Sequence, residues 1–255
     1  MPYQPSQYQE PRDPRLPDVP IPGAVWTAEQ IDRNSEKLQR FFDPKRVRLP
    51  NIAGRLTMAP RQVHDRISRW RMPDEPSRFL WLRGEYDPSI GSANKVTTMA
   101  GSLVEQARKV DVAIISYFCK QSNNRPREAV TAILYALIRQ TVELLPPEST
   151  TTIDMSEERF KGLNGEADTW DAALVLFRDA IGLLNSLNCK GFCVLEGVHW
   201  LEGKSTDSSL HQLLETLGST NLKVLFATTG KSTVLLNAIK QRDQIDLSCY
   251  GNDDW

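Results

Sequence analysis

The sequence predicts an α/β protein, a three-layer α/β/α sandwich on a mainly parallel, five-stranded sheet. From Phe79 onward, short apolar runs alternate with longer segments of helical periodicity. The runs are almost continuously apolar, as strands are when helices cover both faces of a parallel sheet. The chain has 255 residues, enough for one such domain with additional segments.

Four apolar runs and a last short segment predict the strands, and the periodic segments of the chain predict the helices. The strands are expected at 79–83, 112–119, 191–196, 223–228 and 244–248. The helices that follow them are expected at 96–109, 127–145, 169–187, 208–217 and 232–240, with a polar loop at 146–167. Pro146 and Pro147 end the second of these helices because proline cannot continue one.

The part of the chain before this pattern divides in two. Residues 1–25 hold seven prolines and too little apolar surface to offset the entropy cost of ordering, so they are predicted to be a disordered arm. Residues 26–76 are predicted to be a helical, basic lead-in to a main domain at 77–255.

Two helices are expected in this lead-in. Thr27 followed by Gln30 resembles a capping box for a helix that extends to Phe42. A second helix is expected at 59–70, where the apolar residues at i, i+4 and i+7 share one face. These residues are Val63, Ile67 and Trp70.

Charge, cysteine usage and hydropathy narrow the class of protein. The net charge is −1, yet residues 45–71 hold eight basic residues against one acid. We interpret this segment as a solvated helix face, or alternatively as a patch for phosphate, nucleic acid or an acidic partner. Nucleic acid is disfavoured because no aromatic platform accompanies the charges.

No apolar run approaches the length of a membrane span, about 18 residues, and no apolar signal core is present near the N-terminus. Cys119, Cys193 and Cys249 lie in apolar runs and are predicted to be reduced core residues. The three histidines are not spaced as a metal site. We therefore expect a cytoplasmic protein with no membrane partner.

The first strand leads into a segment that resembles a phosphate-binding P-loop with its residues out of register. An intact P-loop reads G-x-x-x-x-G-K-[ST], so that backbone N–H groups and the Lys hold phosphates while the hydroxyl holds Mg²⁺. Counting from the Lys, a Ser stands at the first glycine position, an Asn at the second, and Val96 at the hydroxyl position. The candidate nucleotide-binding residues are Gly84, Gly91, Ser92, Asn94, Lys95 and Thr97.

The third strand ends in an acid, which is the form of a Walker B segment. Glu196 is therefore a candidate catalytic carboxylate and, with Thr97, a candidate Mg²⁺ ligand. His199 is a candidate general base, and the alternative is a packed histidine beside Trp200. The tetrapeptides at 203–206 and 230–233 both spell Gly-Lys-Ser-Thr, but neither has a first glycine at the right distance. The second of them could bind an anion weakly through its N–H groups.

The order of these segments resembles the NACHT-type P-loop NTPase module of fungal STAND proteins, also called the nephrocystin-3-like N-terminal domain. The resemblance covers roughly residues 45–255. It depends on residues 64–70, 77–84, 114–119, 132–140, 170–187 and 221–229. It implies a sensor role for Thr228 and Thr229, where the family commonly has Ser-Arg.

Several residues of that family's catalytic motifs are replaced in this chain. The Walker A motif is scrambled, Glu196 replaces an Asp, His199 and Trp200 replace an acidic pair, and Thr229 replaces the sensor Arg. We therefore expect a degenerate module for signalling or interaction that is non-catalytic and binds ATP or GTP with Mg²⁺ weakly or not at all. The alternative is an active or slow ATPase or GTPase that uses Lys95, Thr97 and Glu196. The resemblance implies protein partners, among them other STAND or NACHT proteins or a second copy of the chain.

Overall fold

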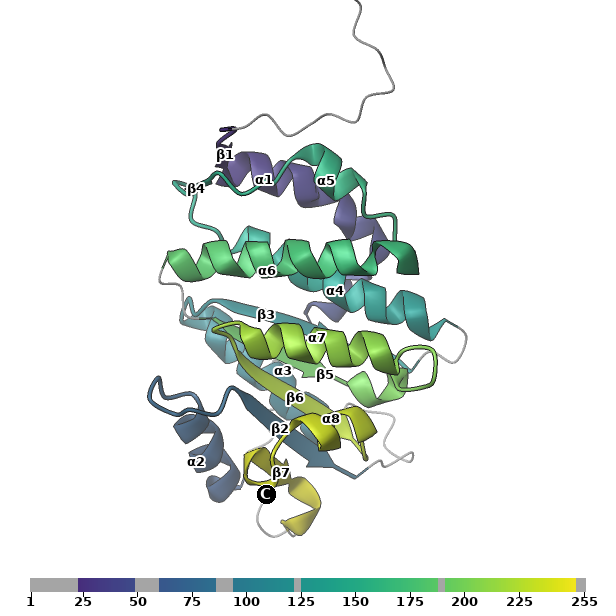
Figure 1. The fold of residues 1–255 in the computed structure, drawn as a ribbon. Helices are drawn as coiled ribbons and strands as arrows, with labels where there is room; N and C mark the ends of the chain where they lie inside the picture. Colours follow the sequence, from purple (N-terminus) through teal and green to yellow (C-terminus); the bar gives the residue numbers. More distant parts are fainter. Residues whose placement is uncertain (1–22, 49–59, 86–93, 122–124, 188–190, 251–255) are drawn as a thin grey trace, which may run out of the picture.

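The structure is a computed structural model that describes residues 23–48, 60–85, 94–121, 125–187 and 191–250. Of the predicted disordered arm, residues 1–22 lie outside the described residues. The described part is an α/β sandwich (Figure 1). None of its helices is long and apolar enough to cross a bilayer.

The central sheet has five strands, all parallel, in the order β3-β5-β6-β2-β7. They are β2 (Phe79–Gly84), β3 (Ile114–Phe118), β5 (Phe192–Glu196), β6 (Lys223–Thr229) and β7 (Gln244–Asp246). Each corresponds to one of the five predicted strands. The predicted fold class and parallel sheet are thus confirmed.

Alternate residues of the strands face two separate cores, as the period of a strand requires. Trp81, Leu195 and Phe226 belong to the larger core, while Leu82, Val194 and Leu225 belong to the smaller one. The larger core is closed by α4 (Pro126–Glu143), α6 (Trp170–Ser186), α7 (Asp207–Ser219) and α8 (Thr233–Ala238). The smaller core is closed by α2 (Arg61–Trp70) and α3 (Lys95–Lys109).

The N-terminal elements form an outer layer on α4 and α6 (Figure 1). They are β1 (Trp26–Thr27), α1 (Ala28–Ser35) and a 3₁₀ helix at Glu36–Phe41, accompanied by β4 (Thr150–Thr151) and α5 (Glu157–Lys161). The expected capping box is present: Gln30 N–H donates to Thr27 Oγ1 at 3.3 Å, and Thr27 N–H donates to Gln30 Oε1 at 2.9 Å.

Three predictions about these segments were wrong. The first helix does not continue in α geometry to Phe42, because it tightens into the 3₁₀ helix at Glu36. The loop expected at 146–167 contains β4 and α5, which are too short for a periodic pattern to reveal. Cys249 is exposed rather than in the core, whereas Cys119 and Cys193 are buried.

The outer edge of β3 is covered by side chains and a loop. Gln140 on α4 accepts from Ser116 N–H at 2.9 Å through Oε1 and donates to the Ser116 carbonyl at 2.9 Å through Nε2. Ser116 Oγ also donates to the Val47 carbonyl at 2.8 Å. The Gln140 amide thus takes the place of a neighbouring strand at this position.

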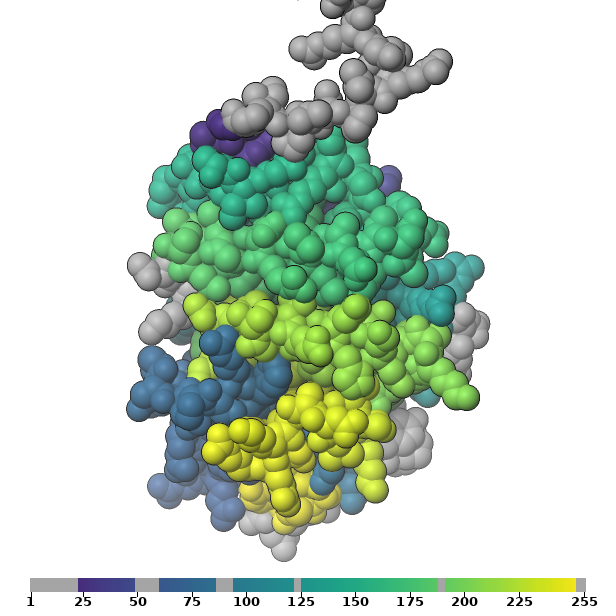
Figure 2. Space-filling model, viewed as in Figure 1, coloured from purple at the N-terminus to yellow at the C-terminus, as the bar shows by residue number. Residues whose placement is uncertain are grey.

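Helix α2 packs beside the C-terminal part of the chain (Figure 1). In Figure 2 its blue surface lies beside the yellow surface of the C-terminal part. Arg66 Nη2 donates to the Arg242 carbonyl at 2.6 Å. Arg61 points outward with a side chain that is 95% exposed, so this part of the basic segment is solvated.

Candidate functional site

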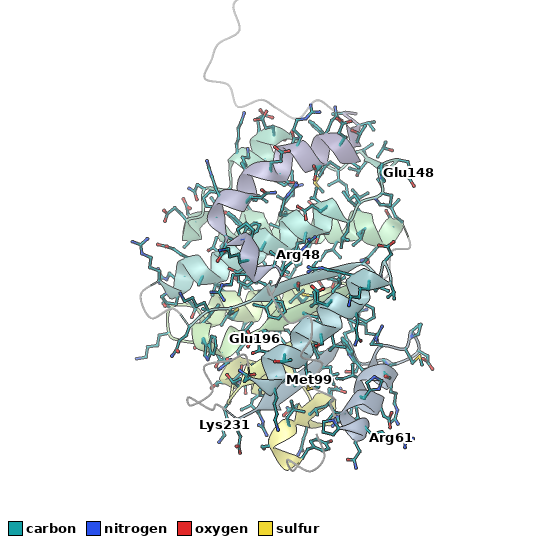
Figure 3. All side chains as sticks on the ribbon, turned by 180° about the vertical axis from the view of Figure 1, so that it is seen from behind. Arg48, Arg61, Met99, Glu148, Glu196 and Lys231 are labelled. Carbon is teal, nitrogen blue, oxygen red and sulfur yellow. The ribbon has the colours of Figure 1, made fainter. Side chains whose placement is uncertain are left out.

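Three strands bring the candidate residues to one edge of the sheet. The carboxyl ends of β2, β6 and β5 are adjacent, with Gly84 opposite Thr229 and Glu196 opposite Ala227. Figure 3 labels Glu196, whose strand ends at this edge. Ligands of open α/β sheets bind at such an edge. Gly91 and Ser92 lie outside the described residues.

Thr97, the hydroxyl that stands one residue late in the P-loop-like segment, reaches Glu196, the candidate Walker B acid. Thr97 Oγ1 donates to Glu196 Oε1 at 2.8 Å. Asn94 is the N-cap of α3, and its Oδ1 accepts from Thr97 N–H at 2.8 Å. Lys95 is the first residue of the same helix. The loop end and the Walker B strand are therefore joined by a continuous chain of hydrogen bonds.

Val96 packs against the end of β2. Its side chain is 2% exposed, and a Cβ built on Gly84 would lie 2.4 Å from Val96 Cγ2. Gly84 is thus required here by a close approach, since an ordinary Cβ contact is much longer. The residue that replaces the P-loop hydroxyl has become part of the smaller core.

Glu196 is a buried carboxyl group. Only 2% of the residue is exposed, and burial raises its pKa to about 7, although the Thr97 hydrogen bond and the charge of Arg46 act in the opposite direction. Burial disfavours the ionised form because water no longer solvates the charge. At neutral pH the carboxyl therefore carries a proton in roughly half of the molecules.

The side-chain oxygens of Thr97 and Glu196 could form part of a Mg²⁺ site. Mg²⁺ usually takes one or two carboxylates together with substrate phosphates, and Thr97 and Glu196 supply two oxygens 2.8 Å apart. The metal would have to displace the proton of Glu196 first. Within the described ranges, no group of three or more His, Cys, Asp or Glu side chains is placed to hold a metal ion.

His199 lies at the same edge but faces a threonine. Its Nε2 is 3.4 Å from Thr229 Oγ1, and its Nδ1 is buried with no hydrogen-bond partner. Burial lowers its pKa to about 4, so the ring is neutral at pH 7. Its centroid lies 5.1 Å from that of Trp200. This geometry favours the interpretation as a packed histidine over that as a general base.

Thr228 serves the interior of the sheet. Its hydroxyl accepts from Trp81 Nε1 at 2.9 Å and donates to the Gly230 carbonyl at 2.9 Å. Both hydrogen bonds are made within the protein. Of the two candidate sensor residues, Thr229 is the one that contacts another candidate site residue, His199.

Glu202 is a residue of this edge to which sequence reasoning gave no role. Its carboxylate accepts from Thr233 N–H at 2.8 Å and from the Ser232 hydroxyl. It therefore fills the place at the start of α8 where we expected an anion to bind weakly. The contact joins residues about 30 positions apart, so no local pattern could have revealed it.

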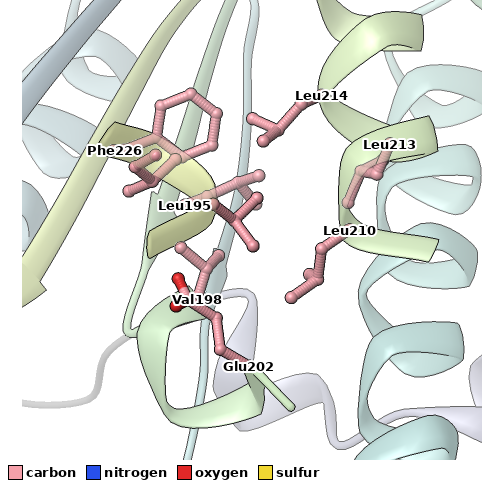
Figure 4. A pocket seen from close by; sticks show the side chains of 9 residues that line it. Leu195, Val198, Glu202, Leu210, Leu213, Leu214 and Phe226 are labelled. Carbon is pink, nitrogen blue, oxygen red and sulfur yellow. The ribbon is translucent and has the colours of Figure 1, made fainter. Parts of the chain in front are cut away.

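Beside Glu202, Leu210 and Val234 line an apolar cavity of about 10 Å³, the size of one water molecule (Figure 4).

Glu202→Ala is expected to destabilise the fold by about 1 kcal/mol, the usual cost of losing a helix cap. Urea unfolding would measure the change. Glu215→Ala, at an exposed position of α7, is the matched control and is expected to change stability by less than about 0.5 kcal/mol. Equal effects of the two substitutions would contradict a capping role.

Comparison with known protein families identifies the family of the domain that contains this edge of the sheet. The family model described as nephrocystin 3, N-terminal, matches residues 62–231. The chain belongs to this family. The matched span begins within α2 and ends at Lys231, so it includes every candidate residue named above.

The nephrocystin 3 N-terminal family is a NACHT-like domain, which confirms the resemblance that the sequence indicated. A search among curated proteins found no match. Membership accounts for the parallel sheet and for the convergence of β2, β5 and β6 at one edge. Function is a separate question, because one fold supports both active and inactive sites.

Proposed function

We propose that this chain is a degenerate NACHT-like module for signalling or interaction, non-catalytic or weakly nucleotide-binding, that acts in the cytoplasm. The observation that carries the proposal is the burial of Val96, which stands where a P-loop has its Mg²⁺-binding hydroxyl and packs against Gly84. A valine side chain has no oxygen to offer a metal ion. Burial also raises the pKa of Glu196 to about 7, so Mg²⁺ would compete with a proton for this carboxyl group near neutral pH.

The surroundings of Glu196 support the same proposal. Hydrolysis needs a group that orients and deprotonates water. The nearest candidate, His199, is a weak base with a pKa of about 4 and faces Thr229. Val96 offers no metal ligand and is buried against Gly84. Loss of one catalytic group alone commonly slows an enzyme by several orders of magnitude.

A slow ATPase or GTPase is the second candidate function. One observation favours it: Thr97 reaches Glu196 despite the shift in register. Lys95 stands at the first position of α3, so all three residues of the alternative mechanism belong to the same edge. In this case ATP or GTP with Mg²⁺ would bind the rearranged loop.

A thermal melt with ATP and Mg²⁺ separates the two candidates. A ligand at 100 times its Kd adds about 2.7 kcal/mol to stability, which corresponds to a rise in Tm of about 5–10 °C for a chain of this size. We expect 1 mM ATP with Mg²⁺ to raise the Tm by less than about 1 °C, because binding is weak or absent. A large rise that Lys95→Ala removes and Lys204→Ala retains would overturn the proposal.

Phosphate release measures the chemistry separately from binding. We expect no release above that of a protein-free control containing ATP or GTP. A steady rate that disappears in Lys95→Ala, with the variant still folded, would establish the second candidate function. A rise in Tm below about 1 °C with no phosphate release would support the proposed module, which binds nucleotide weakly or not at all.

A further inference from the structure

We propose that a groove at the amino ends of the strands binds an acidic peptide segment of a protein partner. This rests on the proposed function, because it assigns the partner surface of an interaction module. The groove has a volume of about 580 Å³, within the range of ligand sites. It lies at the opposite end of the sheet from Glu196. Its lining includes Arg71, Arg78, Val112, Phe192, Asn221 and Lys223.

Charge determines the chemistry of the occupant. The lining carries three cations, Arg71, Arg78 and Lys223, against one acid, Glu75. Across the described ranges, the ion pairs with Asp or Glu include none of these three cations. An Arg guanidinium has five donors suited to carboxylates. The charges of both Glu75 and Asp74 act on Lys223, so the groove keeps a small positive excess and is complementary to an acidic segment.

Two of the cations are held in place by the protein. Lys223 Nζ donates to the carbonyls of Glu75 and Ser77 at 2.5 and 3.0 Å. The Arg71 guanidinium lies 5.8 Å from the centroid of the Phe192 ring. Ordering these side chains before binding reduces the entropy cost of association. This is what distinguishes the groove from a merely solvated basic face.

The groove also offers apolar surface. Phe192 forms part of the wall and packs edge-on against Trp70 at 5.9 Å. Val112 is a second apolar residue of the lining. A peptide with acidic and large apolar side chains fits this combination. Single-stranded nucleic acid fits it less well, since it usually stacks on several aromatic rings and Phe192 is the aromatic residue among the described residues of the lining.

Selection from an unbiased library of displayed dodecapeptides, performed with the whole chain, tests the proposal. We expect the enriched peptides to combine Asp or Glu with Leu, Phe or Trp. The double variant Arg71→Gln/Arg78→Gln should bind the best of them at least tenfold more weakly. The control Arg61→Gln/Arg242→Gln removes the same charge from outside the groove and should bind as the unaltered chain does.

The outcomes separate this proposal from the function on which it rests. Peptides without acidic enrichment, equal losses in both double variants, or displacement of the peptide by a short single-stranded oligonucleotide would each overturn the groove as a peptide site. Nucleotide hydrolysis that depends on Lys95 would overturn the proposed function instead. Peptide binding should be unchanged in Lys95→Ala, because the two sites lie at opposite ends of the sheet.

Discussion

Replacing Glu196 by glutamine is expected to stabilise the folded protein at pH 8. Glutamine resembles the protonated carboxyl group and can still accept the Thr97 hydroxyl proton. The folded pKa of Glu196 is about 7, raised from 4.5 mainly by burial. Between these values the folded state keeps a proton that the unfolded state has released. Stability therefore falls as pH rises through this window, and the full penalty applies above pH 7.

The expected size of the stabilisation by Glu196→Gln follows from the shift in the pKa of Glu196. Each pKa unit corresponds to about 1.4 kcal/mol, so a change from 4.5 to about 7 gives a penalty on the order of 3 kcal/mol. Urea unfolding of both proteins at pH 5, 6, 7 and 8 would measure it. The gain in free energy of unfolding in Glu196→Gln should be small at pH 5 and reach about 2–3 kcal/mol at pH 8.

One control variant and the titration of His199 help to assign the pH dependence to Glu196. Glu215→Gln, at an exposed position on α7, is the matched control and should change stability by less than about 0.5 kcal/mol. His199 acts with the opposite sign, since its pKa is lowered from 6.5 to about 4 and its contribution to stability is lost as pH falls through that range. Glu196→Gln should therefore fall in stability below pH 6.5. A difference in stability between Glu196→Gln and the unaltered chain that is equal at pH 5 and pH 8 would mean that burial does not penalise the ionised form of Glu196.

Gly84→Ala is expected to destabilise the fold by about 2 kcal/mol, the typical cost of overpacking a core. The added methyl group would lie 2.4 Å from Val96 Cγ2, so strand β2 or helix α3 must shift. Urea unfolding would give the change. Gly203→Ala is the matched control, because a Cβ there meets nothing within 4 Å, and it should cost less than about 0.5 kcal/mol.

A double-mutant cycle with Val96→Ala tests whether the clash with Val96 causes the destabilisation by Gly84→Ala. Val96→Ala removes the methyl groups that clash, although it leaves a small cavity of its own. In the double variant the two costs should not add, and we expect a favourable coupling of about 1 kcal/mol or more. Additive costs would show that Gly84 is needed for another reason, such as the backbone conformation of the loop.

The fold was predictable because its signals are local. Four of the five strands of the central sheet are mainly apolar runs, and the Thr27 cap is read from residues three apart. The elements that were missed, β4 and α5, have two and five residues, and the pairing of β4 with β1 brings together Thr151 and Trp26. Short elements of this kind are stabilised by tertiary contacts rather than by their own pattern.

The site was predictable only in its position. Parallel strands bring Gly84, Glu196 and Thr229 to one edge, and that follows from their places at strand ends. The protonation of Glu196 depends on burial by residues from the whole chain, and the contact of Glu202 with α8 spans about 30 positions. Neither the protonation of Glu196 nor the contact of Glu202 with α8 follows from the spacing of residues in the sequence. Both could be seen only in the structure.

The blocked edge of β3 limits how copies of this chain can associate. An exposed edge strand invites another chain to continue the sheet through its backbone. Gln140 occupies the N–H and carbonyl of Ser116, and β7 at the other edge has only three residues. Growth of the sheet from molecule to molecule is thereby disfavoured at both ends. Assembly with a second copy would then be selective, because side chains that differ from face to face would decide which surfaces meet.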